Sequence, residues 1–178
     1  SLRGKRALVT GGSRGIGAAT AILLAECGAD VGIGYKARTD DAAQVAKQVA
    51  DRGVRSFAQA ADIATRQGAD ALLERASREF GGIDLFVANA GIWPTADIAV
   101  AEMDDERWVR TMRENVDAMF FTARAAARVM SDGGRIVRAK AADCEYGPCV
   151  EPDEFGKFAR TCQWKMPVPV ILSAVNAA

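Results

Sequence analysis

Histidine is absent from this sequence of 178 residues, aromatic residues make up only 7%, and no apolar run is long. Histidine is the commonest general acid or base at neutral pH and the commonest metal ligand, so any acid–base chemistry must use tyrosine, lysine, cysteine or carboxylates. The apolar stretches fall well short of the roughly 20 residues that a membrane-spanning helix requires. The N-terminal segment also lacks the apolar stretch of a signal peptide. We therefore expect a soluble, cytoplasmic protein.

The charges and cysteines exclude several further classes. The 23 basic residues balance the 23 acidic ones, and like charges do not gather in runs. We therefore expect no nucleic acid and no membrane among the partners, and a small molecule is the better candidate. Four cysteines in a chain of this length do not indicate a disulfide scaffold. The length is typical of one domain, so we expect residues 1–178 to form a single domain.

Short runs rich in β-branched residues alternate with longer alanine-rich segments of helical period as far as Val137. We expect strands at Arg6–Gly11, Ala29–Tyr35, Val54–Ala60 and Asp84–Gly91, and the start of a fifth strand at 135–137. The expected helices are Gly15–Cys27, Asp40–Asp51, Thr65–Phe80 and Asp104–Met130. This alternation is typical of an α/β protein with a doubly wound parallel sheet in a three-layer α/β/α arrangement. A ligand is expected where the strand order reverses, at the carboxyl ends of the first and fourth strands.

A glycine-rich segment, TGGSRGIG at Thr10–Gly17, joins the first strand to the first helix. Gly11 allows a tight turn, and Gly15 and Gly17 let the backbone approach a diphosphate and let the helix lie close to the sheet. The free amides at the start of the helix then face an anion. The alternative is a glycine-rich turn without a ligand, which the strand before and the helix after make less favoured.

Three further motifs follow along the chain. Asp62-Ile63 follows the third strand, NAG ends the fourth strand at Asn89–Gly91, and Asn115 lies in the long fourth helix. With the T-G-x-x-x-G-x-G spacing of Thr10–Gly17 and the pattern of strands and helices as far as Val137, these motifs give a match over about three quarters of the chain. The sequence resembles the short-chain dehydrogenase/reductase family, and the resemblance implies a Rossmann-type fold and binding of a nicotinamide dinucleotide in one domain.

The resemblance also implies roles for individual residues. The phosphates would contact Gly11, Ser13, Arg14, Ile16 and Gly17; the adenine would be held by Asp62 and Ile63; and the nicotinamide ribose would be approached by Asn89, Ala90 and Gly91. Asn115 would bind a water molecule of the family's proton relay and is the candidate catalytic residue. The alternatives are that Asp62 caps the next segment and that Asn89 and Asn115 satisfy buried backbone groups.

The end of the second strand favours NADP over NAD. An NAD site presents a carboxylate to the ribose 2′-hydroxyl at this point, whereas the 2′-phosphate of NADP needs cations. The sequence supplies Tyr35, Lys36 and Arg38 there, and Arg14 lies beside the same pocket. Asp40 and Asp41 come too late and are expected to cap the next helix. The alternative is that these cations are ordinary solvated surface charges.

The family's catalytic set is not found. The family uses a serine near the end of the fifth strand and a tyrosine followed four residues later by lysine, because a neighbouring ammonium lowers the pKa of the phenol. The serine position falls at Lys140 or Ala141 and the tyrosine position near Glu154 or Phe155. Neither of the two tyrosines is followed by lysine at that spacing. Tyr146 with Lys140 or Lys157 would be a rearranged substitute.

The composition changes after Val137. Three of four cysteines and four of five prolines lie beyond it, but only two of seventeen glycines. Residues 138–178 are therefore expected to be an atypical tail, either divergent or read in a shifted frame. The sixth and seventh strands of the family are not recognisable there, so we expect a C-terminally incomplete fold. Without histidine the cysteines make a weak metal site, and none is expected.

Two functions follow from these observations. The first is an NADP-linked oxidoreductase that transfers hydride to or from a carbonyl or secondary alcohol substrate. The second is a catalytically silent dinucleotide-binding module, favoured by the lack of the serine, tyrosine and lysine. As the family commonly pairs through its long helix, a homo-oligomer through Asp104–Met130 is expected in either case.

Overall fold

The computed structural model describes residues 1–93 and 98–138. The described strands are β1 (Arg6–Thr10), β2 (Asp30–Tyr35), β3 (Ser56–Ala60), β4 (Ile83–Ala88) and β5 (Met130–Arg138). The helices are α1 (Gly15–Glu26), α2 (Thr39–Ala50), α3 (Arg66–Phe80), α4 (Asp105–Met112) and α5 (Ala118–Val129), with the short helices η1 (Val100–Glu102) and η2 (Arg113–Asp117). The expected elements are therefore confirmed, most within two residues at each end.

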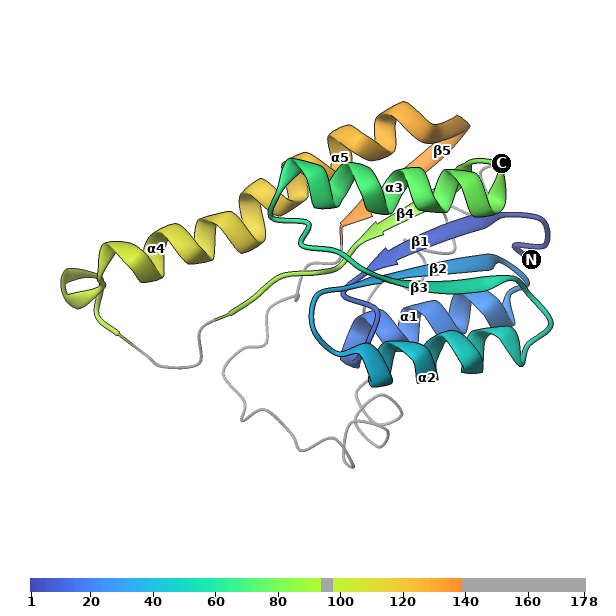
Figure 1. Cartoon of the computed structure of the whole chain (residues 1–178), viewed down its shortest axis with the longest axis horizontal. Coiled ribbons are helices and arrows are strands. Elements are labelled where there is room, and N and C mark those ends of the chain that lie inside the picture. The colour runs from blue at the N-terminus through green and yellow to red at the C-terminus, as the bar shows by residue number, and fades with distance from the viewer. Residues whose placement is uncertain (94–97, 139–178) are drawn as a thin grey trace. The chain divides into compact units, whose positions relative to one another are not determined.

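The five strands form one parallel sheet in the order β3-β2-β1-β4-β5. Helices α1 and α2 cover one face of the sheet, and α3 and α5 cover the other (Figure 1). The order reverses between β1 and β4, since the chain leaves β1 toward β2 and β3 and then returns to the other side of β1. This is the doubly wound, Rossmann-type arrangement that the sequence predicts, and it puts the switch point at the ends of β1 and β4.

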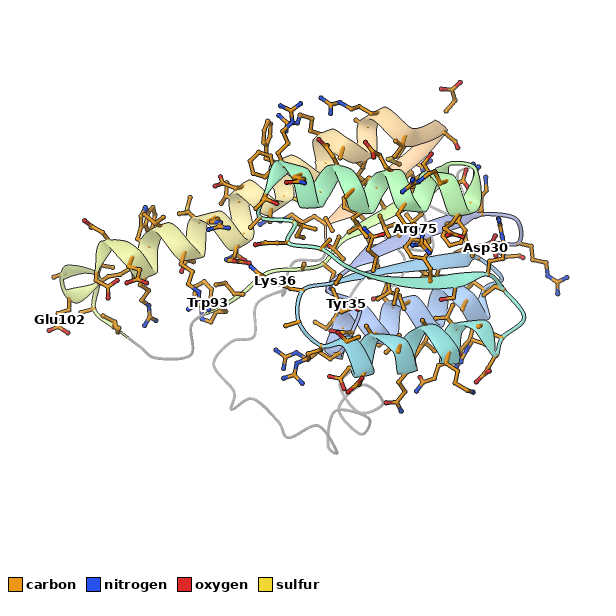
Figure 2. All side chains as sticks on the ribbon, viewed as in Figure 1. Asp30, Tyr35, Lys36, Arg75, Trp93 and Glu102 are labelled. Carbon is orange, nitrogen blue, oxygen red and sulfur yellow. The ribbon has the colours of Figure 1, made fainter. Side chains whose placement is uncertain are left out.

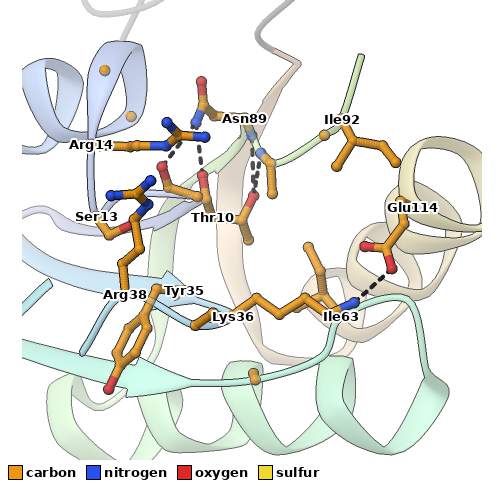
Figure 3. Close-up of a pocket in the computed structure, with 18 of the residues that line it drawn as sticks. Thr10, Ser13, Arg14, Tyr35, Lys36, Arg38, Ile63, Asn89, Ile92 and Glu114 are labelled. Carbon is orange, nitrogen blue, oxygen red and sulfur yellow. Dashed lines mark hydrogen bonds and ion pairs between the residues drawn. The ribbon is translucent and has the colours of Figure 1, made fainter. Parts of the chain in front are cut away.

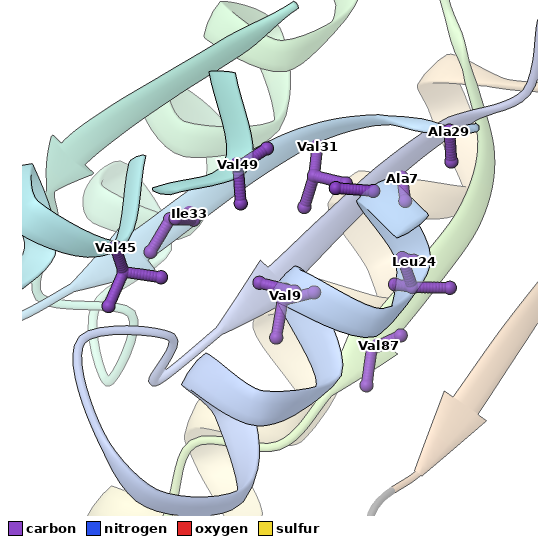
Figure 4. Packing of buried hydrophobic residues seen from close by; sticks show 11 residues of the cluster. Ala7, Val9, Leu24, Ala29, Val31, Ile33, Val45, Val49 and Val87 are labelled. Atoms are coloured by element: carbon purple, nitrogen blue, oxygen red, sulfur yellow. The ribbon is translucent and has the colours of Figure 1, made fainter. Parts of the chain in front are cut away.

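Alternation along the strands divides the core into two layers. Ala7 and Val9 of β1 pack with Val31 and Ile33 of β2 under α1 and α2 (Figure 4). Leu8, between the first two, points to the opposite face and packs with residues of α3 and α5. Successive side chains of a strand face opposite ways, so a strand buried on both faces must be apolar throughout.

The long fourth helix is interrupted rather than continuous. Residues 113–117 form a π-helical turn, η2, between α4 and α5. Such wide turns are rare and are frequent at functional sites. Within this turn, Glu114 contacts Lys36 after β2, and Asn115 contacts Ile92 in the segment that follows β4.

Two boundaries differ from expectation. β5 begins at Met130, opposite Ile83, and its register shifts before Arg135 pairs with Leu85, so Gly133 and Gly134 lie within an irregular strand. Helix α2 begins at Thr39, so Asp40 and Asp41 lie in its first turn and do not cap it. The cap prediction was wrong, because Arg38 occupies the cap position and the two carboxylates lie within the first turn, where they stabilise the amino end through the helix dipole.

The two ends of the sheet differ in chemistry. Asp30 begins β2 at one end, and Lys36 follows β2 at the other (Figure 2). At the Asp30 end, Arg6 of β1 donates two hydrogen bonds to Asp84 of β4, at 2.7 Å from Nε and 2.9 Å from Nη2. That end is tied by ion pairs, whereas the Lys36 end opens into a cleft.

Candidate functional site

A cleft of about 500 Å³ lies at the carboxyl ends of β1, β2 and β4. This size is within the range of small-molecule and cofactor sites. Its lining combines backbone of the glycine-rich turn with side chains from β2, from the segments after β3 and β4, and from η2 (Figure 3). The lining residues are Thr10, Gly11, Ser13–Gly17, Gly34–Arg38, Ala61, Ile63, Asn89–Ile92 and Glu114.

One wall of the cleft is the turn from β1 into α1. Gly15, at a φ of +57°, has open space where a side chain would project, so the backbone there is accessible from the cleft. Gly17 is the reverse case, since a Cβ atom would lie against the Gly11 carbonyl and 2.5 Å from Nδ2 of Asn89. The first amides of α1 have no acceptor within the helix and face the cleft with the positive end of the helix dipole.

Thr10 and Asn89 join this turn to the end of β4. The buried hydroxyl of Thr10 accepts hydrogen bonds from the backbone amides of Asn89 and Ala90, each at 3.1 Å. The side-chain amide of Asn89 donates to the carbonyl oxygens of Thr10 at 3.0 Å and Gly11 at 3.3 Å. Asn89 therefore satisfies backbone groups and holds β1 and β4 in a fixed relation at the switch point.

The opposite wall carries charged side chains. Nζ of Lys36 lies 2.6 Å from Oε1 of Glu114 and 3.1 Å from Oδ1 of Asp62. Arg113 adds a longer contact of 3.5 Å to the other oxygen of Asp62. The hydrogen bond to Glu114 is the main cause that raises the pKa of Lys36, and the contact with Asp62 adds to it. Lys36 therefore stays protonated throughout the neutral range.

Asp62 also bonds to the chain beside it. Its Oδ1 accepts from the backbone amide of Ala64 at 3.2 Å. Partial burial pushes the pKa of Asp62 upward, but the hydrogen bonds from Lys36 and Ala64 and the charge of Arg113 outweigh it, and the pKa lies below its usual value. Asp62 is not among the residues that line the cleft, whereas its neighbours Ala61 and Ile63 are. Its predicted contact with an adenine stays a prediction.

Three other side chains at the end of β2 and the start of α1 were predicted to favour a phosphate. Arg14 is exposed and has no ion-pair partner among the described residues, while Arg38 pairs with Asp41 on the surface at 3.2 Å. Both guanidinium groups lie on the same side of the cleft, and the ring of Tyr35 points away from them (Figure 3). Lys36 extends away from them toward Glu114.

Asn115 lies just outside the cleft. Its Oδ1 accepts from the backbone amide of Ile92 at 3.1 Å, and its Nδ2 donates to the carbonyl oxygens of Ile92 at 2.9 Å and Thr111 at 2.8 Å. The amide thus ties the segment after β4 to η2, as the backbone-satisfying alternative expects. The predicted role of Asn115 in a proton relay stays a prediction.

The cleft brings together twelve of the fourteen residues singled out in the sequence. These are Gly11, Ser13, Arg14, Ile16, Gly17, Tyr35, Lys36, Arg38, Ile63, Asn89, Ala90 and Gly91. Asp62 and Asn115 do not line the cleft, but each contacts a residue that does, Lys36 and Ile92 respectively. Sequence reasoning missed Thr10 and Glu114. Thr10 is the first residue of the TGGSRGIG motif, although no role was assigned to it, and Glu114 directly precedes Asn115, so these positions were the available signals.

The geometry suits a dinucleotide. The cleft is lined by the start of α1, where amides are free, and by Arg14 and Arg38, and these groups match a diphosphate and a further phosphate group. The serine, tyrosine and lysine positions of the family, with Tyr146, Lys140 and Lys157, lie outside the described residues, as does the tail 139–178.

Among residues 1–93 and 98–138, no helix is long and apolar enough to cross a membrane. The cytoplasmic location stays a prediction.

Comparisons with known proteins agree on one family. A family model described as short chain dehydrogenase matches residues 5–149. Versicolorin reductase 1 from Aspergillus parasiticus is 38% identical over 136 residues, which are 76% of this chain and 51% of that protein. A probable tetrahydroxynaphthalene reductase from Zymoseptoria tritici is 37% identical over 76% of this chain and 50% of its own length. The chain thus spans about half the length of the curated relatives that it matches.

Solved structures agree. A short-chain dehydrogenase from Burkholderia cenocepacia, determined in complex with NADP, has a TM-score of 0.75 and 37% identity. A short-chain dehydrogenase/reductase from Serratia marcescens has a TM-score of 0.76 and 35% identity. Each comparison covers 88% of this chain and 63% of the other.

Proposed function

The chain belongs to the short-chain dehydrogenase/reductase family, and we therefore propose that it binds NADP(H) in the cleft and acts as an oxidoreductase on a carbonyl or secondary alcohol. One observation carries the proposal. The cleft joins the free amides of α1 to Arg14 and Arg38, and no carboxylate of β2 lies where an NAD site would present one. The relative solved with NADP supports the same cofactor.

The residues of the cleft have distinct parts in this proposal. The amides at the start of α1 bind the diphosphate, and Ser13 adds a hydroxyl beside them. Ile63 on one side packs against the adenine, and Ala90 and Gly91 leave room for the nicotinamide ribose. Bound NADP(H) would supply the hydride donor or acceptor.

Titration of the full chain with NADPH and NADH, followed by cofactor fluorescence, tests the binding. We expect NADPH to bind at least about tenfold more tightly than NADH, since a phosphate between two guanidinium groups contributes more than 1 kcal/mol. Lys47→Gln, on α2 away from the cleft, is the matched control and should bind as the wild type does. Binding of neither cofactor would contradict the proposal.

A second candidate is a dinucleotide-binding module without catalysis. The observation in its favour is the absence of tyrosine followed four residues later by lysine from the printed sequence. An NADPH oxidation assay against a panel of aliphatic and aromatic ketones separates the two. Turnover above the background supports the oxidoreductase, and binding without turnover supports the silent module.

The homo-oligomer expected from the sequence is also a proposal. Four large apolar side chains on α4, η2 and α5 are at least half exposed, namely Trp108, Val109, Val116 and Phe120. Their spacing puts them on one side of the long helix, where pairing with a second copy would cover them. Sedimentation velocity should show a dimer or larger species that Val116→Lys dissociates and Gln44→Lys on α2 does not. A monomeric wild type would refute this proposal.

A further inference from the structure

Lys36 and the two arginines near it do not form one cation cluster. Lys36 follows β2 directly and was predicted to share in binding a 2′-phosphate with Arg14 and Arg38. In the structure its side chain crosses toward η2, and its ammonium lies between Glu114 and Asp62 (Figure 3). Two carboxylates therefore neutralise the cation that is nearest in sequence to the expected phosphate.

Glu114 is the stronger of these two partners. Its distance to Nζ of Lys36 is 2.6 Å, against 3.1 Å for Asp62, and its side chain is only 19% exposed. Asp62 has two other contacts, the amide of Ala64 and the guanidinium of Arg113. If Lys36 left, Asp62 would keep these partners, whereas Glu114 would lose its only hydrogen-bond donor among those identified in the described residues. Moving Lys36 to a ligand is therefore opposed mainly by Glu114.

The arginines have no such restraint. Arg14 has no ion-pair partner among residues 1–93 and 98–138, and the pair of Arg38 with Asp41 is on the surface, with both side chains about half exposed. Exposed pairs of this kind contribute little and are readily exchanged. Both arginines can thus bind a phosphate dianion without breaking a strong contact.

We propose that Glu114 is a specificity-determining residue for the cofactor, because it holds Lys36 away from the ribose 2′-phosphate and leaves NADPH selectivity to Arg14 and Arg38. This inference rests on the proposed function. Glu114 acts through Lys36, so it is a positioning residue. Removing its charge frees a long, flexible side chain that can turn toward the phosphate.

Calorimetric titration of the full chain with NADPH and with NADH tests the inference. Glu114→Gln should tighten NADPH binding about fivefold, the size of one exposed ion pair, and change NADH binding by less than about twofold. Lys36→Gln alone should change NADPH binding by less than about twofold, because Lys36 does not contact the phosphate. Arg38→Gln should weaken NADPH binding about tenfold and leave NADH binding unaffected.

The double variant of Glu114→Gln with Lys36→Gln is the decisive control. If the gain in NADPH affinity arises from Lys36, the double variant loses it and binds as Lys36→Gln does. A gain that persists without Lys36, no gain in Glu114→Gln, or a selective tenfold loss in Lys36→Gln alone would each overturn the inference. Circular dichroism of each variant verifies that it is folded.

Failure of the proposed function has a different signature. A wild type that binds neither cofactor overturns both the function and the inference. A wild type that binds NADPH selectively, with an affinity that Glu114→Gln does not improve, overturns the inference and leaves the function standing.

Discussion

The two walls of the cleft differ in the atoms that form them. The wall at the β1 to α1 turn is backbone, held by the steric fit of Gly17 and by the hydrogen bonds of Thr10 and Asn89. The wall at η2 is made of charged side chains, in which Lys36 contacts both Glu114 and Asp62 across long separations in sequence. The first wall is part of the fold, whereas the second depends on Lys36, whose side chain is about half exposed, and can change without unfolding the chain.

This contrast separates two kinds of residue that sequence motifs treat alike. Substitutions in the backbone wall should cost stability and binding together, because the same atoms serve both. Substitutions in the charged wall should alter the choice between cofactors and have little effect on stability, since exposed ion pairs contribute at most about 1 kcal/mol.

The largest effect is expected for Gly17→Ala. Its methyl group would collide with backbone at the Gly11 carbonyl, which cannot move without displacing the turn. We expect a loss of about 2–3 kcal/mol in the free energy of unfolding and a loss of about 100-fold in dinucleotide affinity. Urea unfolding and fluorescence titration measure the two quantities.

The matched control for Gly17→Ala is Gly15→Ala. Gly15, unlike Gly17, has a positive φ, and a side chain there meets open space, so the variant reports backbone strain without collision. We expect a loss of about 1 kcal/mol. Equal losses in the two variants would contradict the steric account of this wall.

The next largest loss of stability is expected from a change at the amino ends of β1 and β4, opposite the cleft. Hydrogen bonds from the Arg6 guanidinium hold the pKa of Asp84 below its usual value, although partial burial opposes this. Because the pKa is lower in the folded chain than in the unfolded one, the stabilisation is complete above the unfolded pKa of about 3.9 and is lost as the pH falls through the folded value.

Asp84→Asn should therefore lower the free energy of unfolding at pH 7 by about 2 kcal/mol and flatten its decline in acid, with cofactor affinity little changed. Urea unfolding between pH 7 and pH 3 measures this. Asp51→Asn, which breaks an exposed pair with Lys47, should cost less than about 0.5 kcal/mol. An acid profile of Asp84→Asn parallel to that of the wild type would exclude the role given to this pair.

A smaller effect is expected for Thr10→Val. The variant keeps the shape of the side chain but removes the oxygen that accepts from the amides of Asn89 and Ala90. The amide of Asn89 keeps the carbonyl oxygen of Val87 as an acceptor, but the partly buried amide of Ala90 loses its acceptor, which should cost about 1–2 kcal/mol in the free energy of unfolding. Thr10→Ser keeps the oxygen and should recover most of it. If serine and valine destabilise equally, the hydroxyl is not what joins β1 to β4.

The smallest stability effect is expected in the charged wall. Glu114→Gln should change the free energy of unfolding by less than about 1 kcal/mol, since the Lys36 side chain is 52% exposed. Thermal unfolding in low and high salt measures it, and salt should reduce the small difference further. A loss comparable to that of Gly17→Ala would end the distinction between the two walls.

Most of the sheet and its helices could be predicted because their signals are local. The short apolar runs of β1 and β2, the threonine cap of α3 at Thr65, and the Gly81-Gly82 stop after it each operate within one turn or strand. The break of the long helix at 113–117 could not be predicted, since its sequence keeps a helical period. The irregular start of β5 depends on its pairing with β4, which no local pattern states.

The glycine-rich turn, the NAG segment and their place at the switch point follow from the sequence alone, because backbone sterics and strand order fix where such residues can lie. Only the tertiary structure decided which way the charges point. Lys36 and Glu114 are 78 positions apart, and a flexible lysine takes its direction from the carboxylates that the fold brings near it. Local sequence cannot contain that information, since the partner arrives only when η2 is folded against the end of β2.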